Sequence, residues 1–460
     1  MTDLTVDCAN YDTRFRSPYL RTRRQHGGWL AGPLLLLVLV TAGCTSYSAN
    51  PLPEQPAWQG AALLRGRPLT VDQVVAAALE HSPDVRQARR DVAAAAAKQY
   101  ADTLLPDPQL SLTRDFPGAQ GFVPAFMAGI SYEVSALITH PAKERASLSE
   151  YRQHQLALQW VQWQVANRAY ALFVTGVGLE RLRRRVEDLL SWQRTYRDRM
   201  QSALARADAT VDVAAQAEAG YRDSLQQLAV LKQEQNKTLK ELNALLDLPP
   251  GQKLAFAPPP ETPPIPATTV QSALADLPNR RPDLEALAAG YHAQDERYRA
   301  AILAQFPRLE VGFTRGRDTS AIYTSGFTVS VALPVFNRNR GNIAIERATR
   351  ERLHDEYAQR LKDASAAVQT TMEALDMLDT QIRNAQKAEQ ALERVEQATS
   401  HAYAQRDTDL AALADINARL LTQRIATTRL ENSRLQLQAT LCTLIGVSAI
   451  DHQPLQHDRA

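Results

Sequence analysis

The sequence predicts a mainly helical protein with a small β part, built from two copies of one unit. Three observations carry this prediction: a long internal repeat, two very long stretches without proline, and two pairs of short runs in which apolar and polar residues alternate. In the repeat, the segment Ser82–Val85 recurs 199 residues later as Arg281–Leu284. A repeat of this length indicates two similar structural units related by pseudo-symmetry. The same offset pairs Ala101 with Ala300, Leu104 with Leu303, Pro108 with Pro307, Leu110 with Leu309, and Leu112 with Val311.

The repeat sets the expected domain boundaries. A linker over residues 249–267 separates the copies and holds eight of the 25 prolines, so we expect it to be extended and semi-rigid. The full expected order is a signal peptide over 1–43, an N-terminal linker over 44–65, the first repeat over 66–248, the Pro-rich linker over 249–267, the second repeat over 268–446 and a C-terminal tail over 447–460.

The N-terminus has the order of a secretory signal. An arginine-rich segment precedes the apolar run Trp29–Val40, which is too short to span a bilayer, and small residues come just before Cys44. The segment Thr41-Ala42-Gly43-Cys44 resembles a bacterial lipoprotein signal, which implies that Cys44 is acylated and becomes the new N-terminus. Thr45 follows it where Asp would imply retention in the inner membrane, so the resemblance favours the outer membrane. An ordinary cleaved signal with an incidental cysteine is the alternative.

Each copy opens with helices. We expect a short helix over 71–80 in the first copy and over 268–277 in the second. The prolines Pro83 and Pro282 then suit the first turn of a longer helix, because the N–H that proline lacks has no partner there. These longer helices are expected to end near Thr103 and Ala304, each before a further proline.

Each copy then contains a predicted pair of strands, joined by loops at 117–124 and 315–325. The alternation over about 8–10 residues in each run is what a tilted strand of a membrane barrel needs, whereas a half-buried soluble sheet is the commoner source of such patterns. Lone hairpins are only marginally stable, and four strands cannot close a barrel, so several chains would have to contribute. The apolar positions are Leu110 and Leu112, then Ile130, Tyr132, Val134, Ala136 and Ile138, then Leu309, Val311 and Phe313, then Phe327, Val329, Val331 and Leu333.

Two very long helical stretches follow the strand pairs. Residues 342–445 contain neither Gly nor Pro, and residues 142–248 contain no Pro. Apolar residues recur at spacings of three, four and seven, which is typical of coiled-coil-like seams. These positions are Leu179, Leu182, Val186 and Leu189 in the first copy and Leu430, Leu437, Leu441 and Leu444 in the second. We expect each stretch to fold back once, at 206–210 and at 405–408, with legs long enough to span a distance.

Composition excludes several classes of function. Without residues 1–43 the chain has 47 basic and 47 acidic residues, so it carries no basic field for nucleic acid. Only one stretch is apolar enough to suggest a membrane helix, which excludes a polytopic transporter. Three cysteines without CxxC spacing and nine scattered histidines do not favour a metal site, and nucleotide-binding and hydrolase motifs are absent. We therefore expect no cofactor, no metal and no enzyme activity.

The sequence resembles the TolC family of outer-membrane efflux ducts over about residues 66–446. The resemblance rests on the duplicated Pro-Asp helix openings, on the segment from Leu333 to Asn342 after the second strand pair, and on Asp212-Val213 and Asp409-Leu410 after the two turns. The segment Thr139–Arg145 after the first pair is similar to the CzcC-like heavy-metal branch, although His140-Pro141-Ala142 replaces its glycines.

The resemblance implies a homotrimer in which each chain supplies four membrane strands and a duplicated set of long-helix hairpins. Together the chains would form a twelve-stranded β-barrel in the outer membrane of a Gram-negative bacterium, above an α-helical barrel in the periplasm. It implies a passive duct that receives cargo from an inner-membrane RND-type pump through a periplasmic adaptor. Heavy-metal cations are one cargo class; drugs and metabolites remain open.

The helix turns are the implied gate. The candidates in the first copy are Arg206, Asp208 and Asp212, and those in the second are Arg406, Asp407 and Asp409. Rings of acidic residues across three chains would favour cations, whereas an Asp after a turn often only caps the next helix. The arginines would act as latches beside them. Tyr132 and Tyr323 are candidates for an interfacial aromatic girdle, and Cys442 for a small core residue.

Two other functions fit less of the sequence. A periplasmic adaptor should have one helical hairpin flanked by β-rich halves, whereas two hairpins are expected here. A coiled-coil scaffold lipoprotein would explain the helices but leave the duplicated strand pairs unexplained.

The lipid anchor has a direct test. Replacing Cys44 by Ala removes the thiol that would be acylated, so the variant should incorporate no radiolabelled palmitate in growing cells. Labelling at the wild-type level in Cys44→Ala would exclude acylation of this residue.

Overall fold

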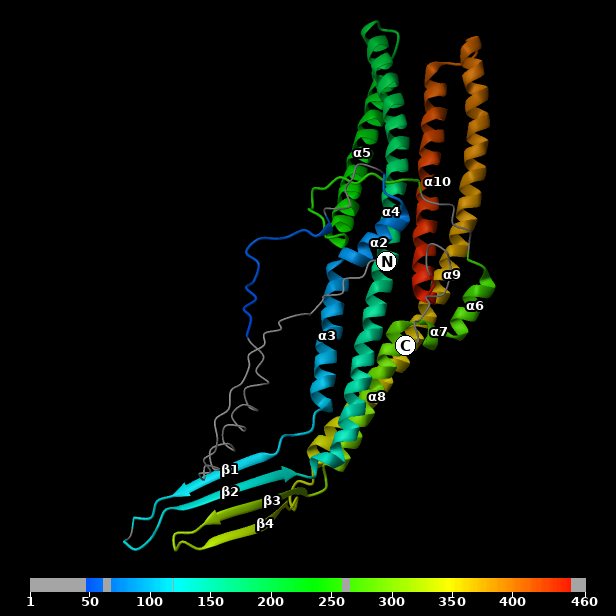
Figure 1. Ribbon diagram of the computed structural model, residues 1–460. Helices are drawn as coiled ribbons and strands as arrows, with labels where there is room; N and C mark the ends of the chain where they lie inside the picture. The colour runs from blue at the N-terminus through cyan, green and yellow to red at the C-terminus, as the bar shows by residue number, and fades with distance from the viewer. Residues whose placement is uncertain (1–46, 61–67, 119, 259–264, 448–460) are drawn as a thin grey trace, which may run out of the picture. The chain divides into compact units, whose positions relative to one another are not determined.

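A computed structural model of the chain describes residues 47–60, 68–118, 120–258 and 265–447. The structure is mainly helical and contains one four-stranded antiparallel sheet, which confirms the predicted fold class (Figure 1). The expected signal peptide, Cys44 and all of the expected tail after residue 447 lie outside the described residues.

The chain divides into two units, Met1–Ala57 and Trp58–Ala460. Of the first unit the structure describes residues 47–57, which are exposed and form no helix or strand. Every helix and strand discussed below belongs to the second unit.

The order of elements repeats along the second unit. The first set comprises α2 (Val71–His81), α3 (Pro83–Thr103), β1 (Gln109–Asp115), β2 (Ala125–Glu133), α4 (Ala136–Ala205) and α5 (Val211–Leu245). The second set comprises α6 (Ala267–Ala275), α7 (Leu277–Arg280), α8 (Pro282–Leu303), β3 (Arg308–Arg317), β4 (Tyr323–Ala332), α9 (Arg340–Gln405) and α10 (Leu410–Ile445). The sets differ in their first part, where the helix expected over 268–277 is split into α6 and α7, with Pro278 in the first turn of α7.

The helix starts follow from local chemistry. Pro83 and Pro282 occupy the first position of α3 and α8, as predicted, because the fixed φ of proline suits a helix start. At α2 a capping box forms: the Thr70 hydroxyl accepts from the backbone N–H of Gln73, and the Gln73 side chain accepts from the N–H of Thr70.

The predicted end of the second strand is wrong. The second run was expected to alternate through Val134, Ala136 and Ile138, but β2 ends at Glu133 and α4 begins at Ala136. The N–H groups of Val134 and Ser135 both donate to the Leu309 carbonyl oxygen, and the Ile138 N–H donates to that of Ser135. The chain therefore leaves the ladder and enters a helical turn, whose apolar residues resemble an alternating strand over so short a length.

The loop of the second pair is also shorter than predicted. Residues 315–325 were expected to form it, whereas β3 runs to Arg317 and β4 starts at Tyr323. Asp318 closes the remaining turn, since its carboxylate accepts from the N–H groups of Ser320 and Ile322 at 2.8 and 2.9 Å. Polar turn-forming residues on both sides of this turn made the loop look longer than it is.

The two hairpins form one sheet in the order β1-β2-β3-β4, with all neighbours antiparallel. Strands β2 and β3 join the two copies, with Tyr132 opposite Val311 and Ile130 opposite Phe313. Within the described part of the chain, β1 and β4 each have one neighbour only, so each leaves one edge of backbone groups unpaired.

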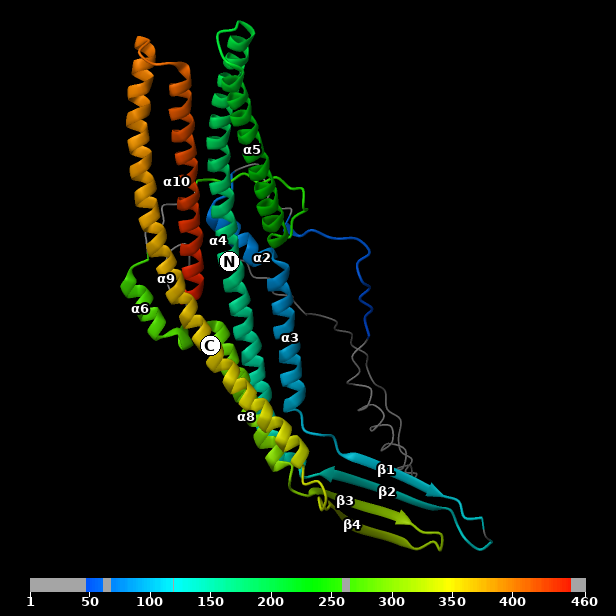
Figure 2. The same cartoon turned by 180° about the vertical axis from the view of Figure 1, so that it is seen from behind.

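Two long helices lead away from the sheet. Helix α4 has 70 residues and α9 has 66, so each is about 100 Å long. The chain reverses between α4 and α5 and between α9 and α10, at both predicted turns. Helix α4 contacts α2, α3, α5, α8 and α10, while α9 contacts α8 and α10 (Figures 1 and 2).

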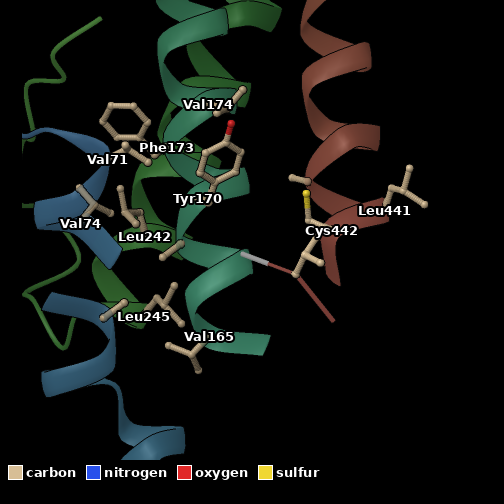
Figure 3. Close-up of a cluster of buried hydrophobic side chains, with 14 of the residues drawn as sticks. Val71, Val74, Val165, Tyr170, Phe173, Val174, Leu242, Leu245, Leu441 and Cys442 are labelled. Carbon is tan, nitrogen blue, oxygen red and sulfur yellow. The ribbon is translucent and has the colours of Figure 1, made fainter. Parts of the chain in front are cut away.

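The main core lies where α2, α5 and α10 pack against the middle of α4. Figure 3 shows Phe173 of α4 near Val71 of α2, with Leu242 of α5 beneath. Phe173 is fully buried and meets the Phe256 ring edge-on, with centroids 5.4 Å apart. Burial of one such side chain stabilises the fold by about 2–3 kcal/mol. Cys442 of α10 lies in this core, as predicted, and burial raises the pKa of its thiol to about 12.

A second core cluster lies further along α4, toward the turns. Leu182, Val186 and Leu189 are buried against α5 and α10, and Leu179 packs partly against them. The predicted seam of the first copy is thereby confirmed. In the second copy Leu441 is buried and Leu444 packs partly against the main core.

Ion pairs hold α3, α4 and α8 together below the main core. Glu150 of α4 accepts from the Lys98 ammonium of α3 at 2.7 Å and from the Arg297 guanidinium of α8. Arg145 pairs with Glu296 of α8 at 3.0 Å. Burial by itself raises the pKa of Glu150, but the Lys98 hydrogen bond and the charge of Arg297 outweigh it and leave the pKa below its ordinary value of 4.5.

This pairing predicts a pH dependence of stability. Because the folded-state pKa of Glu150 is depressed, its contribution is complete above about pH 4.5 and is lost as the pH falls through the folded-state pKa. The thermal midpoint of the wild type should therefore fall more steeply in acid than that of Glu150→Gln, followed by circular dichroism. The control is Glu144→Gln, an exposed residue of the same helix without an ion pair in the described part of the chain. Equal slopes for the wild type and Glu150→Gln would contradict the assignment.

Candidate functional site

One face of the sheet is apolar and exposed. The strand register places Leu110, Ile130, Phe313 and Phe327 in one row across all four strands. Phe327 is 87% exposed, and Leu112 is 74% exposed, so the described residues leave most of this face uncovered. The large apolar side chains on it are Leu110, Leu112, Phe126, Ile130, Tyr132, Leu309, Val311, Phe313, Tyr323, Phe327, Val329 and Val331.

The opposite face is polar. Its side chains include Gln109, Ser111, Thr113, Ser131, Glu133, Glu310, Thr314, Thr324, Thr328 and Ser330. Glu133 lies directly opposite Glu310 in the ladder, and the Ser135 hydroxyl donates to the Glu133 carboxylate at 2.9 Å. The repeat offset does not relate these two glutamates, so nothing in the sequence leads one to expect them side by side. The pairing of β2 with β3 brings them together.

Tyr132 and Tyr323 lie near opposite ends of the apolar face. Tyr323 ends the row of Arg114, Phe126 and Arg317 beside the loops, while Tyr132 stands opposite Val311, toward the helices. A pair of interfacial aromatic belts requires such a separation. Among the described residues, no helix combines the length and the apolarity that a membrane crossing needs.

The turn between α4 and α5 is closed by its own residues. Arg206 ends α4, and its guanidinium donates to the Asp208 carboxylate at 3.0 Å. Both side chains are exposed. Asp212 lies in the first turn of α5, where the Thr210 hydroxyl and the free N–H groups of the helix start lower the pKa of its carboxyl. The sequence-predicted residues of the first copy thus lie together at one turn.

The turn between α9 and α10 is built differently from the turn between α4 and α5. Arg406 is left-handed, with φ at 66°, and Asp409 is the N-cap of α10, whose carboxylate accepts from the Ala412 N–H at 2.8 Å. The side chains of Arg406 and Asp407 are exposed and make no ion pair or hydrogen bond within the described residues. Arg206 is thus paired with the aspartate two positions on, whereas Arg406 and Asp407 remain open to solvent.

One tyrosine near the end of α4 is affected by charges at the start of α10. Burial raises the pKa of Tyr196 on α4, and the charges of Asp409 and Asp415 on α10 raise it further. Tyr196 is not among the residues predicted from the sequence, because no local pattern relates a tyrosine near the end of α4 to the start of α10. No group of three or more potential metal ligands occurs among the described residues.

Known outer-membrane channels resemble this chain in sequence or in structure. Residues 273–447 match the model of a family described as outer membrane efflux protein. The structure is similar to that of OprN, an outer-membrane channel, with a TM-score of 0.70, 16% identity, and coverage of 88% of this chain and 99% of that chain. The chain has the fold of the TolC-like outer-membrane channels.

Two further channels have similar structures. The Campylobacter jejuni CmeC outer membrane channel has a TM-score of 0.69 at 17% identity, with 87% of this chain and 94% of that chain covered. CusC, a transmembrane channel, has a TM-score of 0.65 at 17% identity, with 88% and 100% covered. No curated protein matches the sequence.

Two substitutions distinguish the capping role of Asp409 from the effect of its charge. Asp409→Ala should destabilise the start of α10 by about 1 kcal/mol, while Asp409→Asn keeps a good N-cap and should be nearly neutral. Hydrogen exchange of the amides in the first turn of α10 measures this, with faster exchange expected in the Ala variant only. Equal exchange in both variants would show that the carboxylate does not cap the helix.

Proposed function

We propose that this chain is one third of an outer-membrane duct of a tripartite efflux system. The observation that carries the proposal is the sheet: one exposed apolar face, one polar face and two unpaired edges, joined to helices about 100 Å long. No single compact domain needs this combination, whereas a membrane pore continued by a long tunnel does.

Closure of the sheet requires further chains. In hydrocarbon an unpaired backbone N–H or carbonyl costs several kcal/mol, so strands cross a membrane only in closed barrels. Four strands are too few to close, whereas three chains would supply twelve, with β4 of one chain beside β1 of the next. The apolar face would then contact lipid and the polar face would line the pore.

The same three chains would continue as an α-helical barrel through the periplasm. The long helices carry many charged and polar side chains, which keep both surfaces of such a tunnel wet. Transport along it needs no chemistry by the chain, so the duct is passive and is not an enzyme. An inner-membrane RND-type pump would supply the energy and deliver cargo through a periplasmic adaptor.

The proposed domain arrangement keeps the boundaries expected from the repeat. Residues 66–248 and 268–446 are the two repeats, joined by 249–267, and the signal peptide over 1–43 directs the chain to the outer membrane of a Gram-negative bacterium. Acylation of Cys44 would anchor the mature chain to lipid there. Heavy-metal cations are the proposed cargo, on the resemblance of the segment from Thr139 to Arg145 to the CzcC-like branch.

The helix turns form the proposed periplasmic gate. Asp407 and Asp409 of three chains would form acidic rings that favour cations. The side chains of Arg406 and Asp407 form no ion pair or hydrogen bond within the described residues and would act as latches to neighbouring chains, whereas Arg206 is paired with Asp208 within its own turn. Asp212 would add negative charge beside it.

The test combines mass and conductance. Protein extracted from outer membranes in detergent should have the mass of a trimer by light scattering and should form narrow, cation-preferring channels in a planar bilayer. Asp407→Asn with Asp409→Asn keeps the helix cap and removes two charges per chain, so it should weaken the cation preference. The matched control is Asp188→Asn with Asp223→Asn, which removes two charges per chain from exposed positions on α4 and α5 away from the turns.

One outcome would contradict the proposed duct, and another would contradict only the proposed gate. A monomer without conductance would favour an adaptor or a scaffold lipoprotein. A conducting trimer whose cation preference survives the double substitution would leave the duct intact and restrict the aspartates to structural roles.

A further inference from the structure

Three arginines stand on the apolar face of the sheet, all at its loop end. Arg114 belongs to β1, and Arg315 and Arg317 belong to β3. The register puts Arg114, Phe126, Arg317 and Tyr323 in one row across the four strands, and Arg315 in the next row. These three arginines, called the arginine belt below, therefore project from the same face as the apolar side chains.

The belt has no acidic partner. None of its guanidinium groups forms an ion pair within the described part of the chain, and the Arg317 Nε is buried without a hydrogen-bond partner. The nearby Asp115 belongs to the opposite, polar face, and the Asp318 carboxylate is occupied by the N–H groups of its own turn. Three positive charges on an otherwise apolar surface are thus left without compensation.

Aromatic rings and one backbone oxygen hold two of the arginines in place. The Arg114 guanidinium lies 5.0 Å from the centroid of Phe116, and that of Arg317 lies 5.9 Å from Phe126. Arg317 also donates to the Pro124 carbonyl oxygen at 2.9 Å. Phe126 meets Tyr323 edge-on at 6.4 Å, which completes a surface of guanidinium groups interleaved with rings.

The belt marks one end of the apolar face only. From Arg317 the face continues through Phe313 and Val311 to Leu309, about 27 Å along the strand. The helix end of this face has no basic side chain, since Arg308 belongs to the polar face. Lipid-facing arginines cost least at the boundary of the hydrocarbon, where they reach the headgroups.

We propose that the arginine belt binds the phosphate groups of lipid A in the outer leaflet of the outer membrane. The inference rests on the proposed duct, in which the helices occupy the periplasm and the loop end of the sheet therefore faces outward. Guanidinium groups bind phosphate oxygens in a bidentate manner. Lipid A carries its phosphates on the sugars of its headgroup, next to the hydrocarbon layer. The interleaved rings contact the adjoining sugar and acyl surface.

The test compares two triple variants of the trimer purified from outer membranes. One is Arg114→Gln/Arg315→Gln/Arg317→Gln, which removes the belt. The matched control, Arg308→Gln/Arg338→Gln/Arg340→Gln, removes the same charge from the other end of the strands and from the start of α9. Mass spectrometry measures the lipid A that copurifies, and delipidated trimers are titrated with lipid A, with dephosphorylated lipid A and with inorganic phosphate.

The wild type and the control should retain lipid A, while the belt variant should bind it at least about tenfold more weakly, because charge-assisted contacts to phosphate are lost. Dephosphorylated lipid A should bind the wild type as weakly as lipid A binds the belt variant, and inorganic phosphate should not displace the lipid. If the belt variant fails to assemble, Arg315→Gln alone replaces it, because the exposed Arg315 side chain forms no hydrogen bond, ion pair or ring contact within the described residues. A partial loss of lipid A binding is then expected.

Three results would overturn the proposal. They are equal lipid A binding by the wild type and the belt variant, an equal loss in the control, and full displacement by inorganic phosphate. Conductance separates the two proposals. A wild-type trimer that conducts while the belt variant binds lipid A normally contradicts the lipid site alone, whereas a wild-type chain that neither oligomerises nor conducts contradicts the duct and the site together.

Discussion

The unpaired edges of β1 and β4 are the constraint on which the rest of the structure depends. Within the described residues, the four strands leave two rows of backbone donors and acceptors without partners. The exposed apolar face beside them favours a lipid environment, in which water cannot pair with these groups. In the proposed duct, further copies of the chain would satisfy both requirements at once, because they would pair the edges and turn the apolar face toward lipid. The proposed trimer is thus a consequence of backbone hydrogen bonding before it is one of side-chain recognition.

Helix α4 transmits the geometry of the sheet to the far end of the molecule. It begins three residues after β2 and contacts α2, α3, α5, α8 and α10 along its 70 residues. Near the sheet it is fixed by ion pairs such as Glu150 with Lys98, and beyond them by the apolar cores around Phe173 and Leu182. Ion pairs therefore fix α4 near the sheet, and buried apolar side chains fix it further along.

The charged residues divide into those that shape the chain and those left for contacts outside it. Asp409 caps α10, and Arg206 is paired with Asp208 within its turn. Asp407 and the arginine belt, in contrast, have no ion pair within the described residues. A duct that does no chemistry would use such residues at its two ends, where it meets a neighbouring chain or a lipid surface.

The sequence by itself determined the repeat, the proline starts of α3 and α8, both turns of the long helices and the two-faced character of the strands, because each is a local property of spacing or residue type. The tertiary structure decided where β2 ends, since the N–H groups of Val134 and Ser135 both donate to the Leu309 carbonyl oxygen and the regular strand pairing stops there. It also decided that Glu133 lies opposite Glu310 and that the charge of Asp409 raises the pKa of Tyr196. Those relations join residues far apart in the chain, and they depend on how β2 pairs with β3 and α4 packs on α10, which no periodicity records.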